Sequence, residues 1–183
     1  MHFSPTTIQT QRLTLRFFEP GDAPALFAIF SDSAVVQYWS SGEWDDMSHA
    51  TTMIAETLDA YKSGDGVRLA VILTETGELV GQVNLYHMFH ENRRCELGYA
   101  MNRAHWGHGY VTEALEAAME YAFGALNLNR IEADIDPRND VSEKVLRRLG
   151  FKKEGFMPER WIVKGEVCDT TYFGLLKRDW EAR

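Results

Sequence analysis

The stretch NRAHWGHGYVTEALEAAMEYAFGAL, residues 102–126, places two glycines directly before a segment with the apolar spacing of a helix. Gly107 and Gly109 flank His108, and the expected helix runs from about Val111 to Leu126. The first turn of a helix leaves backbone N–H groups unpaired and carries the positive end of the helix dipole. Because glycines let an anion approach the backbone closely, the pattern predicts an anion-binding turn. A single Gly-x-Gly is also typical of an ordinary turn.

Several other kinds of site do not fit the sequence. A P-loop would require Gly-Lys-Ser or Gly-Lys-Thr after the glycines, and a dinucleotide fingerprint would require a third glycine and a different order of strands. Cys95 and Cys168 are too few and too isolated for a disulfide framework or a zinc site. We therefore expect no metal, and we expect both cysteines to pack as small apolar groups.

The elements that must position this turn follow from hydrophobic periodicity. A helix is expected after Asp22, a plausible N-cap, and Gly150 is expected as the glycine just past the last helix. The pattern predicts one α+β domain over residues 1–183, with a mixed, mainly antiparallel sheet of about seven strands flanked by about four helices. The expected strands are Arg12–Phe18, Val67–Thr74, Leu79–Phe89, Cys95–Met101, Arg130–Asp136, Met157–Val163 and Val167–Leu175, and the other helices are Ser48–Lys62, Val111–Leu126 and Asp140–Gly150. The strand–helix–strand unit from Cys95 to Asp136 should be a right-handed parallel crossover.

Composition limits the classes of partner. The chain of 183 residues has a net charge of −8, which argues against a nucleic-acid surface. Residues 1–90 carry 11 acidic and 4 basic side chains, so this half could attract a cationic partner or could simply keep the protein in solution. No apolar run approaches the roughly 20 residues that span a bilayer, and the N-terminus does not look like a signal peptide. We expect no membrane partner and a cytoplasmic location.

The ordered set of motifs resembles the GNAT superfamily of acetyl-CoA-dependent N-acetyltransferases. It is most similar to the branch of the ribosomal-protein N-terminal acetyltransferases RimJ and RimL. The resemblance covers nearly the whole chain and rests on the stretches TQRLTLRFFEPGDAPAL, GQVNL, ELGYAM, WGHGYVTEAL, RNDVSEKVLRRLGFKKEG and GEVCDTTYFGLL. Each stretch is modest alone, but their order is that of the family.

The resemblance implies where acetyl-CoA, the co-substrate, would bind. Its pantetheine arm would run beside the strand end at Ala100 and Met101, and Asn139 would bond the pantetheine or cap its own helix. In the wider superfamily a Gln or Arg often precedes the first glycine by three residues, but Ala104 stands there. Arg103 or His108 could supply positive charge instead. The pyrophosphate would lie on the backbone of Trp106, Gly107, His108, Gly109, Tyr110, Val111 and Thr112.

Candidate catalytic residues also follow from the resemblance. Many GNAT enzymes carry a tyrosine acid at the position of Leu146, whereas the RimL-like branch has a serine at Ser142 that is thought to help the departing thiolate. Ser142 could equally support only the start of its helix. Glu96 is a possible general base because its strand lies beside the thioester. Glu159 and Asp169 compete for that role.

The acceptor is expected to be a primary amine. The first hypothesis is the N-terminal α-amine of a protein, plausibly a ribosomal protein. A small amine such as a polyamine, an amino acid or an antibiotic comes next, and a non-catalytic acyl-CoA sensor is a third. Trp39 and Trp44 could cover the amine or pack structurally, with Glu43, Asp45 and Asp46 attracting its charge. A homodimer through the sheet edge or the final strands is plausible for this family.

Overall fold

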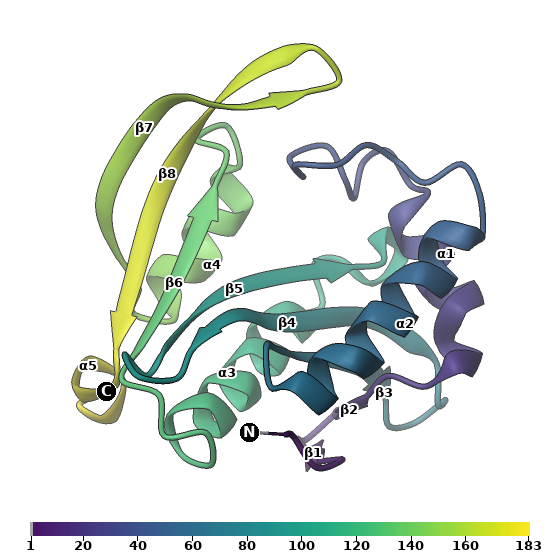
Figure 1. The fold of residues 1–183 in the computed structure, drawn as a ribbon, viewed down its shortest axis with the longest axis horizontal. Coiled ribbons are helices and arrows are strands. Elements are labelled where there is room, and N and C mark those ends of the chain that lie inside the picture. The colour runs from purple at the N-terminus through teal and green to yellow at the C-terminus, as the bar shows by residue number, and fades with distance from the viewer. Residues whose placement is uncertain (1) are drawn as a thin grey trace.

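The computed structural model describes residues 2–183, which form one mixed sheet of eight strands with helices on both faces (Figure 1). The strands are β1 (Thr7–Gln9), β2 (Leu13–Phe17), β3 (Val67–Leu73), β4 (Leu79–Phe89), β5 (Arg94–Met101), β6 (Arg130–Ile135), β7 (Lys152–Val163) and β8 (Glu166–Leu176). Their order is β1-β2-β3-β4-β5-β6-β8-β7, and β5 and β6 form the parallel pair in an otherwise antiparallel sheet. The expected α+β class and the parallel pairing of β5 with β6 are confirmed.

The sheet divides the hydrophobic core into two parts, and helices cover each of them. The helices are α1 (Ala23–Phe30), α2 (Ser48–Ser63), α3 (Tyr110–Phe123), α4 (Asp140–Arg148) and α5 (Lys177–Glu181), with 3-10 turns η1 (Pro20–Asp22) and η2 (Arg103–His105). In Figure 1, α1 and α2 lie in front of the sheet and α3 lies behind it. Alternate side chains of a strand point to opposite faces. Leu69 and Val71 of β3 accordingly join the core that includes α3, whereas Ala70 and Ile72 join the core of α1 and α2.

Most predicted boundaries lie within a few residues of the observed ones. Gly150 adopts a left-handed φ of 91° just after α4, so its expected place past the helix is confirmed. The helix α3 ends at Phe123 rather than Leu126, because Gly124 follows and leaves helical geometry. Strand β1 and helix α5 were not predicted, since three and five residues are too short to show a period.

Asp22 stands at the N-cap position of α1, but its side chain makes no cap hydrogen bond to that helix, so the predicted capping role is wrong. Both carboxylate oxygens accept hydrogen bonds from the Arg16 guanidinium at 2.8 Å. One oxygen also accepts from the Glu19 backbone N–H at 2.8 Å, which closes the η1 turn instead. A charged guanidinium is a stronger donor than a backbone amide, and β2 brings Arg16 within reach.

Candidate functional site

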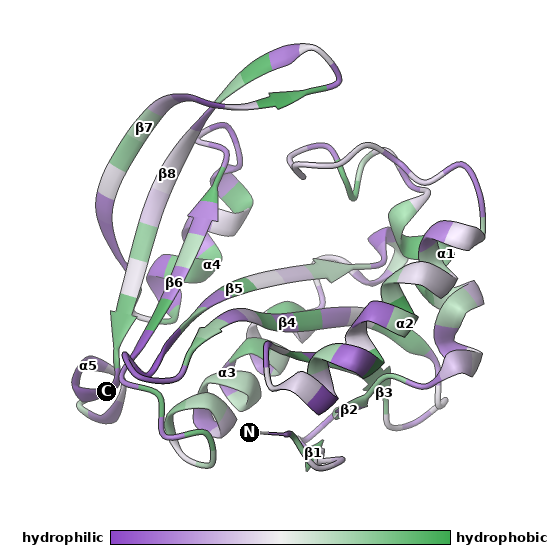
Figure 2. Cartoon of the chain, in the orientation of Figure 1, coloured by the Kyte–Doolittle hydropathy of each residue, from purple (hydrophilic) through white to green (hydrophobic). Residues whose placement is uncertain are grey.

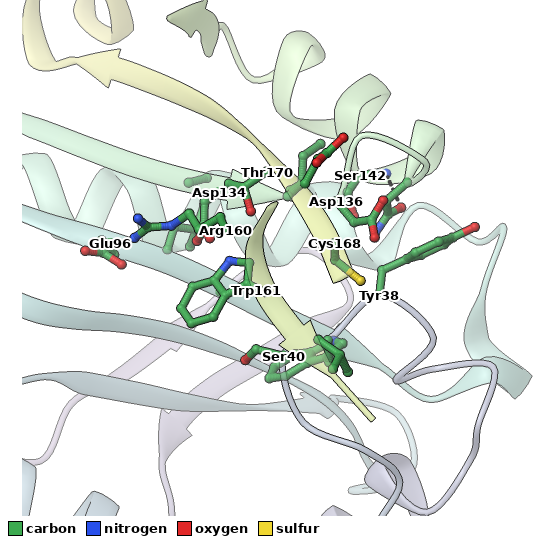
Figure 3. Close-up of a pocket in the computed structure, with 18 of the residues that line it drawn as sticks. Tyr38, Ser40, Glu96, Asp134, Asp136, Ser142, Arg160, Trp161, Cys168 and Thr170 are labelled. Carbon is green, nitrogen blue, oxygen red and sulfur yellow. Dashed lines mark hydrogen bonds between the residues drawn. The ribbon is translucent and has the colours of Figure 1, made fainter. Parts of the chain in front are cut away.

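The sheet splits where β5 and β6 diverge. The two strands pair only through Arg94, Cys95 and Glu96 of β5, and the rest of β5 has no strand partner on that side. A cavity of ≈ 440 Å³ lies in this opening (Figure 3). Its walls include residues 96–99 of β5, residues 133–135 of β6 with Asp136 just after it, and the start of α4 at Asn139 and Ser142. The split therefore creates a site at the edge of two strands rather than on a flat face.

Two segments far from this opening in sequence cover it. Residues 37–40 of the connection between α1 and α2 line the cavity, and so do Arg160 and Trp161 of β7. At the tip of the β7–β8 hairpin, Lys164 Nζ lies 2.9 Å from the carboxylate of Glu43 in that connection. This ion pair links the two covering segments.

The glycine turn precedes α3 as predicted and has an open side. Gly107 and Gly109 adopt left-handed φ values of 79° and 80°, which side chains with a Cβ rarely adopt. A Cβ built on Gly107 would meet no atom within 4 Å. Within residues 2–183, the backbone N–H groups of residues 107–112 donate no hydrogen bond. Six consecutive free donors at a helix N-terminus can hold an anion that carries more than one phosphate.

Arg12 holds this turn from the N-terminal segment. Its Nη1 donates to the His108 carbonyl at 2.9 Å, its Nε lies 2.7 Å from the Glu113 carboxylate, and its guanidinium lies 4.6 Å from the Tyr110 ring centre. Glu113 also accepts hydrogen bonds from the Arg12 backbone N–H and from Thr10 Oγ1. Burial raises the pKa of Glu113, but the hydrogen bonds from Thr10 and Arg12 outweigh it and hold the pKa below its ordinary value.

The two sources of positive charge expected from the sequence are engaged elsewhere. Arg103 Nε lies 3.0 Å from the Asp32 carboxylate, and His108 Nδ1 lies 2.9 Å from the Trp106 carbonyl. Arg12 is therefore the guanidinium that contacts the turn. Trp106 itself is 46% exposed, and its Nε1 donates to the Met101 carbonyl at 2.8 Å.

Two residues with hydroxyl groups, Tyr99 of β5 and Ser142 of α4, line the cavity. Asn139 caps α4 through its side-chain oxygen, which accepts from the Ser142 backbone N–H at 3.0 Å, and both residues line the cavity. Burial raises the pKa of Tyr99 to about 12, and the neighbouring Ser142 side chain opposes this rise only in part. Leu146 is fully buried, so α4 offers no hydroxyl at that position.

The acidic groups of the cavity differ in how well they are neutralised. Arg138 pairs with both Asp136 and Glu166, and its hydrogen bond to Asp136 lowers the pKa of that carboxyl. Glu96 lies 3.2 Å from His87 Nδ1. Asp134 forms no ion pair with any residue of the described chain, and burial followed by the negative charge of Glu96 raises its pKa. Neither Glu96 nor Asp134 therefore pairs with an arginine or lysine among residues 2–183.

The other acceptor-side expectations have mixed outcomes. Trp39 lines the cavity, but Trp44 is buried and its ring stacks on Phe30 at 4.6 Å, so it cannot cover a substrate. Glu159 is not among the lining residues. Asp169 lines the cavity, but one of its oxygens accepts the Glu159 backbone N–H at 2.8 Å.

Comparison with known proteins identifies the fold and its chemistry. The family described as Acetyltransferase (GNAT) domain matches residues 12–152. A relative from Bacillus licheniformis, "Uncharacterized N-acetyltransferase p20", is 40% identical over 95% of this chain and 98% of the relative. This chain belongs to the GNAT acetyltransferase family. It is an acetyl-CoA-dependent N-acetyltransferase with a single GNAT fold.

Other relatives of this acetyltransferase carry names that refer to different acceptors or to none. "Putative ribosomal N-acetyltransferase YdaF" of Bacillus subtilis is 30% identical over 93% of this chain and 94% of its own. The spermidine N(1)-acetyltransferase of Escherichia coli is 26% identical over 83% of this chain and 79% of its own. A GNAT acetyltransferase from Bacillus anthracis superposes with a TM-score of 0.85 at 28% identity, covering 94% of this chain and 99% of that structure. Spermidine N-acetyltransferase from Vibrio cholerae, in complex with CoA and spermine, shares the fold with a TM-score of 0.84 at 21% identity, over 94% and 99% of the two chains.

The sequence did not predict a role in the acetyltransferase site for Arg12, Tyr99 or Asp134. The strand RIEADID did contain a usable signal, because alternation places Glu132, Asp134 and Asp136 on one face. No comparable signal marked Arg12 or the Tyr99 hydroxyl, whose partners lie in distant segments.

Proposed function

We propose that this enzyme transfers the acetyl group of acetyl-CoA to the N-terminal α-amine of a protein in the cytoplasm, with a ribosomal protein as the first candidate. The observation that carries the proposal is the run of free N–H groups at the start of α3. A diphosphate needs several donors and no particular side chain, so this turn fits it. The residues that would hold the co-substrate are Ala100, Met101, Trp106, Gly107, His108, Gly109, Tyr110, Val111, Thr112 and Asn139.

The acceptor side would provide the negative charge that an ammonium group requires. An α-amine has a pKa near 8, so roughly a tenth of it is neutral at pH 7 and only a weak base is needed. Glu96 and Asp134 lie on adjacent strands, and the pairing of Glu96 with Glu132 places Asp134 on the same face. These two carboxylates would bind the ammonium group and take up its proton. Acetyl-CoA supplies the activated thioester, and Ser142 would support the departing sulfur.

The charge distribution favours an acceptor with one ammonium group over a polyamine. Asp136 and Glu166 both pair with Arg138, whereas Glu96 and Asp134 lie together and neither pairs with an arginine or lysine among residues 2–183. A polyamine would gain from a second unneutralised acidic group, because each of its ammonium groups loses water on binding. The likeness to "Putative ribosomal N-acetyltransferase YdaF", at 30% identity over 93% of this chain, supports the same choice.

The second candidate function is acetylation of a small amine, and the likeness to the spermidine enzyme favours it. Incubating the protein with acetyl-CoA and each acceptor class, followed by mass spectrometry, separates the two. We expect acetyl groups on the N-terminus of protein or peptide acceptors. Acetyl groups found only on free spermidine would contradict the proposal of a protein acceptor.

A thermal-shift assay with acetyl-CoA, CoA, ATP and NAD in parallel tests the co-substrate site directly. Ligands that bind only the folded state raise the melting temperature, so acetyl-CoA and CoA should stabilise the protein and the other two should not. If acetyl-CoA raises the melting temperature but no amine causes the release of CoA, a non-catalytic acyl-CoA sensor would be favoured. A melting temperature that neither acetyl-CoA nor CoA raises would contradict the proposed co-substrate site.

We also propose that the protein forms a homodimer through β7. This strand is the edge of the sheet, and Figure 2 shows hydrophobic residues along the outer part of the β7–β8 hairpin. Phe156, Ile162 and Val167 are 51%, 74% and 53% exposed there. An unpaired edge with apolar side chains favours pairing with another chain. Light scattering should give twice the chain mass, and Ile162→Lys should give a monomer.

A further inference from the structure

The hydroxyl of Tyr99 has an unusual environment. Its oxygen is buried and forms no hydrogen bond within 3.5 Å among residues 2–183, although the Ser142 side chain lies close enough to lower its pKa slightly. Leaving a buried hydroxyl without a partner costs about 1–3 kcal/mol, and native proteins rarely retain such a group without a reason. An unidentified partner outside the chain would explain why this position carries tyrosine rather than phenylalanine.

The position of Tyr99 indicates what that partner is. The ring packs on the core beneath α3, beside Ala114 and Leu115, and the residue borders the cavity together with Ser142 at the start of α4. The Tyr99 side chain thus lies between α3 and the N-terminal turn of α4. The N-terminal turn of α4 carries the positive end of a helix dipole, which favours a negative charge nearby. Tyr99 also belongs to the part of β5 that β6 leaves open, where the resemblance places the thioester.

We propose that the Tyr99 hydroxyl is a catalytic hydrogen-bond donor to the sulfur of the leaving group, an inference that rests on the proposed function. The amine nitrogen forms its bond to the acetyl carbon, and the C–S bond breaks with its electron pair leaving on sulfur. Tyr99 gives its hydroxyl proton to that sulfur and takes the second proton of the amine nitrogen. The tyrosine therefore ends the reaction as it began, and the products are an amide and a thiol.

Two features of this chain agree with that role. Burial raises the pKa of Tyr99 to about 12, so the hydroxyl keeps its proton at physiological pH and is always able to donate. In addition, the buried Leu146 cannot donate a proton from α4. The donor comes instead from β5, where the Ser142 side chain is close enough to influence its pKa.

The test compares Tyr99→Phe with the wild type in binding CoA and desulfo-CoA, which lacks only the thiol. Loss of one hydrogen bond changes an equilibrium by about fivefold, so the wild type should prefer CoA by about that factor and the variant should have no preference. The rate constant kcat, measured with spermidine and with a peptide that begins with alanine, should fall by about 10²-fold for whichever acceptor reacts. The melting temperature of the unliganded variant should be unchanged or higher, because an unpaired hydroxyl has been removed.

Thr171→Val is the matched control. The Thr171 hydroxyl is also buried without a partner among the described residues, but Thr171 does not line the cavity. This variant should keep the preference for CoA and the activity of the wild type. A wild type that binds both ligands equally, or a Tyr99→Phe protein that still prefers CoA, would overturn the inference. If the wild type binds neither ligand, the proposed co-substrate site fails instead.

Discussion

Removing the Arg12 side chain should weaken acetyl-CoA binding and leave the chemical step almost intact. Arg12 does not line the cavity, and its contacts are with the turn that carries the free N–H groups. In Arg12→Ala the two glycines regain their freedom to adopt other backbone angles. A binding-competent turn is then less populated, and the apparent Kd rises in inverse proportion to that population.

The size of this effect follows from three contacts. The ion pair with Glu113 contributes about 0.5 kcal/mol at a surface position, since the Arg12 side chain is 44% exposed. The hydrogen bond to the His108 carbonyl contributes about 1 kcal/mol, and the contact with the Tyr110 ring about 0.5 kcal/mol. A full loss of about 2 kcal/mol corresponds to about a 30-fold rise in Kd, and half of it to about fivefold. We therefore expect a rise between these limits.

Calorimetric titration with CoA measures the Kd, and steady-state kinetics should show a higher KM for acetyl-CoA with kcat within about twofold. Arg12→Lys keeps the charge but cannot make all three contacts, so its Kd should lie between those of the wild type and Arg12→Ala. Arg103→Ala is the control, because Arg103 precedes the turn and pairs with Asp32. Its Kd should match the wild type. An unchanged Kd in Arg12→Ala, or a fall in kcat without a change in KM, would refute the reasoning.

Three further predictions test the site. Gly107→Ala and its control Gly77→Ala should each lose about 1 kcal/mol of stability, because both glycines have positive φ and open surroundings. Only Gly107→Ala should weaken the binding of CoA in a titration. Ser142→Ala should lower kcat about tenfold and change the affinity for CoA by less than about twofold. The Asn139 cap should survive this change, because it accepts its hydrogen bond from the Ser142 backbone N–H and not from the side chain. Normal turnover in Ser142→Ala would indicate that the serine is purely structural. Burial and Glu96 raise the pKa of Asp134, so its ionised form destabilises the fold above the unfolded pKa of about 3.9. Asp134→Asn should therefore raise the melting temperature at pH 7, with the difference vanishing below about pH 4, and a lower melting temperature at pH 7 would contradict this.

Local periodicity was sufficient for most of the fold. The α3 helix and the strand Arg130–Asp136 show their period within a single segment, and each was predicted to within three residues at either end. Asp22 shows the limit of such reasoning, because its position was correct and its partner was not. The Asp22 carboxylate pairs with Arg16 of β2 instead of the backbone N–H groups of α1. Which of these donors it meets depends on how β2 packs beside the helix.

The sequence by itself determined the glycine turn, since left-handed φ values and a following helix are properties of neighbouring residues. Only the tertiary structure brought Arg12 to His108 across 96 positions of chain, and only it left the Tyr99 hydroxyl buried beside Ser142. It also set Asp134 next to Glu96 through the register of β5 and β6. Strand register and helix packing minimise the free energy of the whole chain, so contacts between distant segments have no signature within either segment alone.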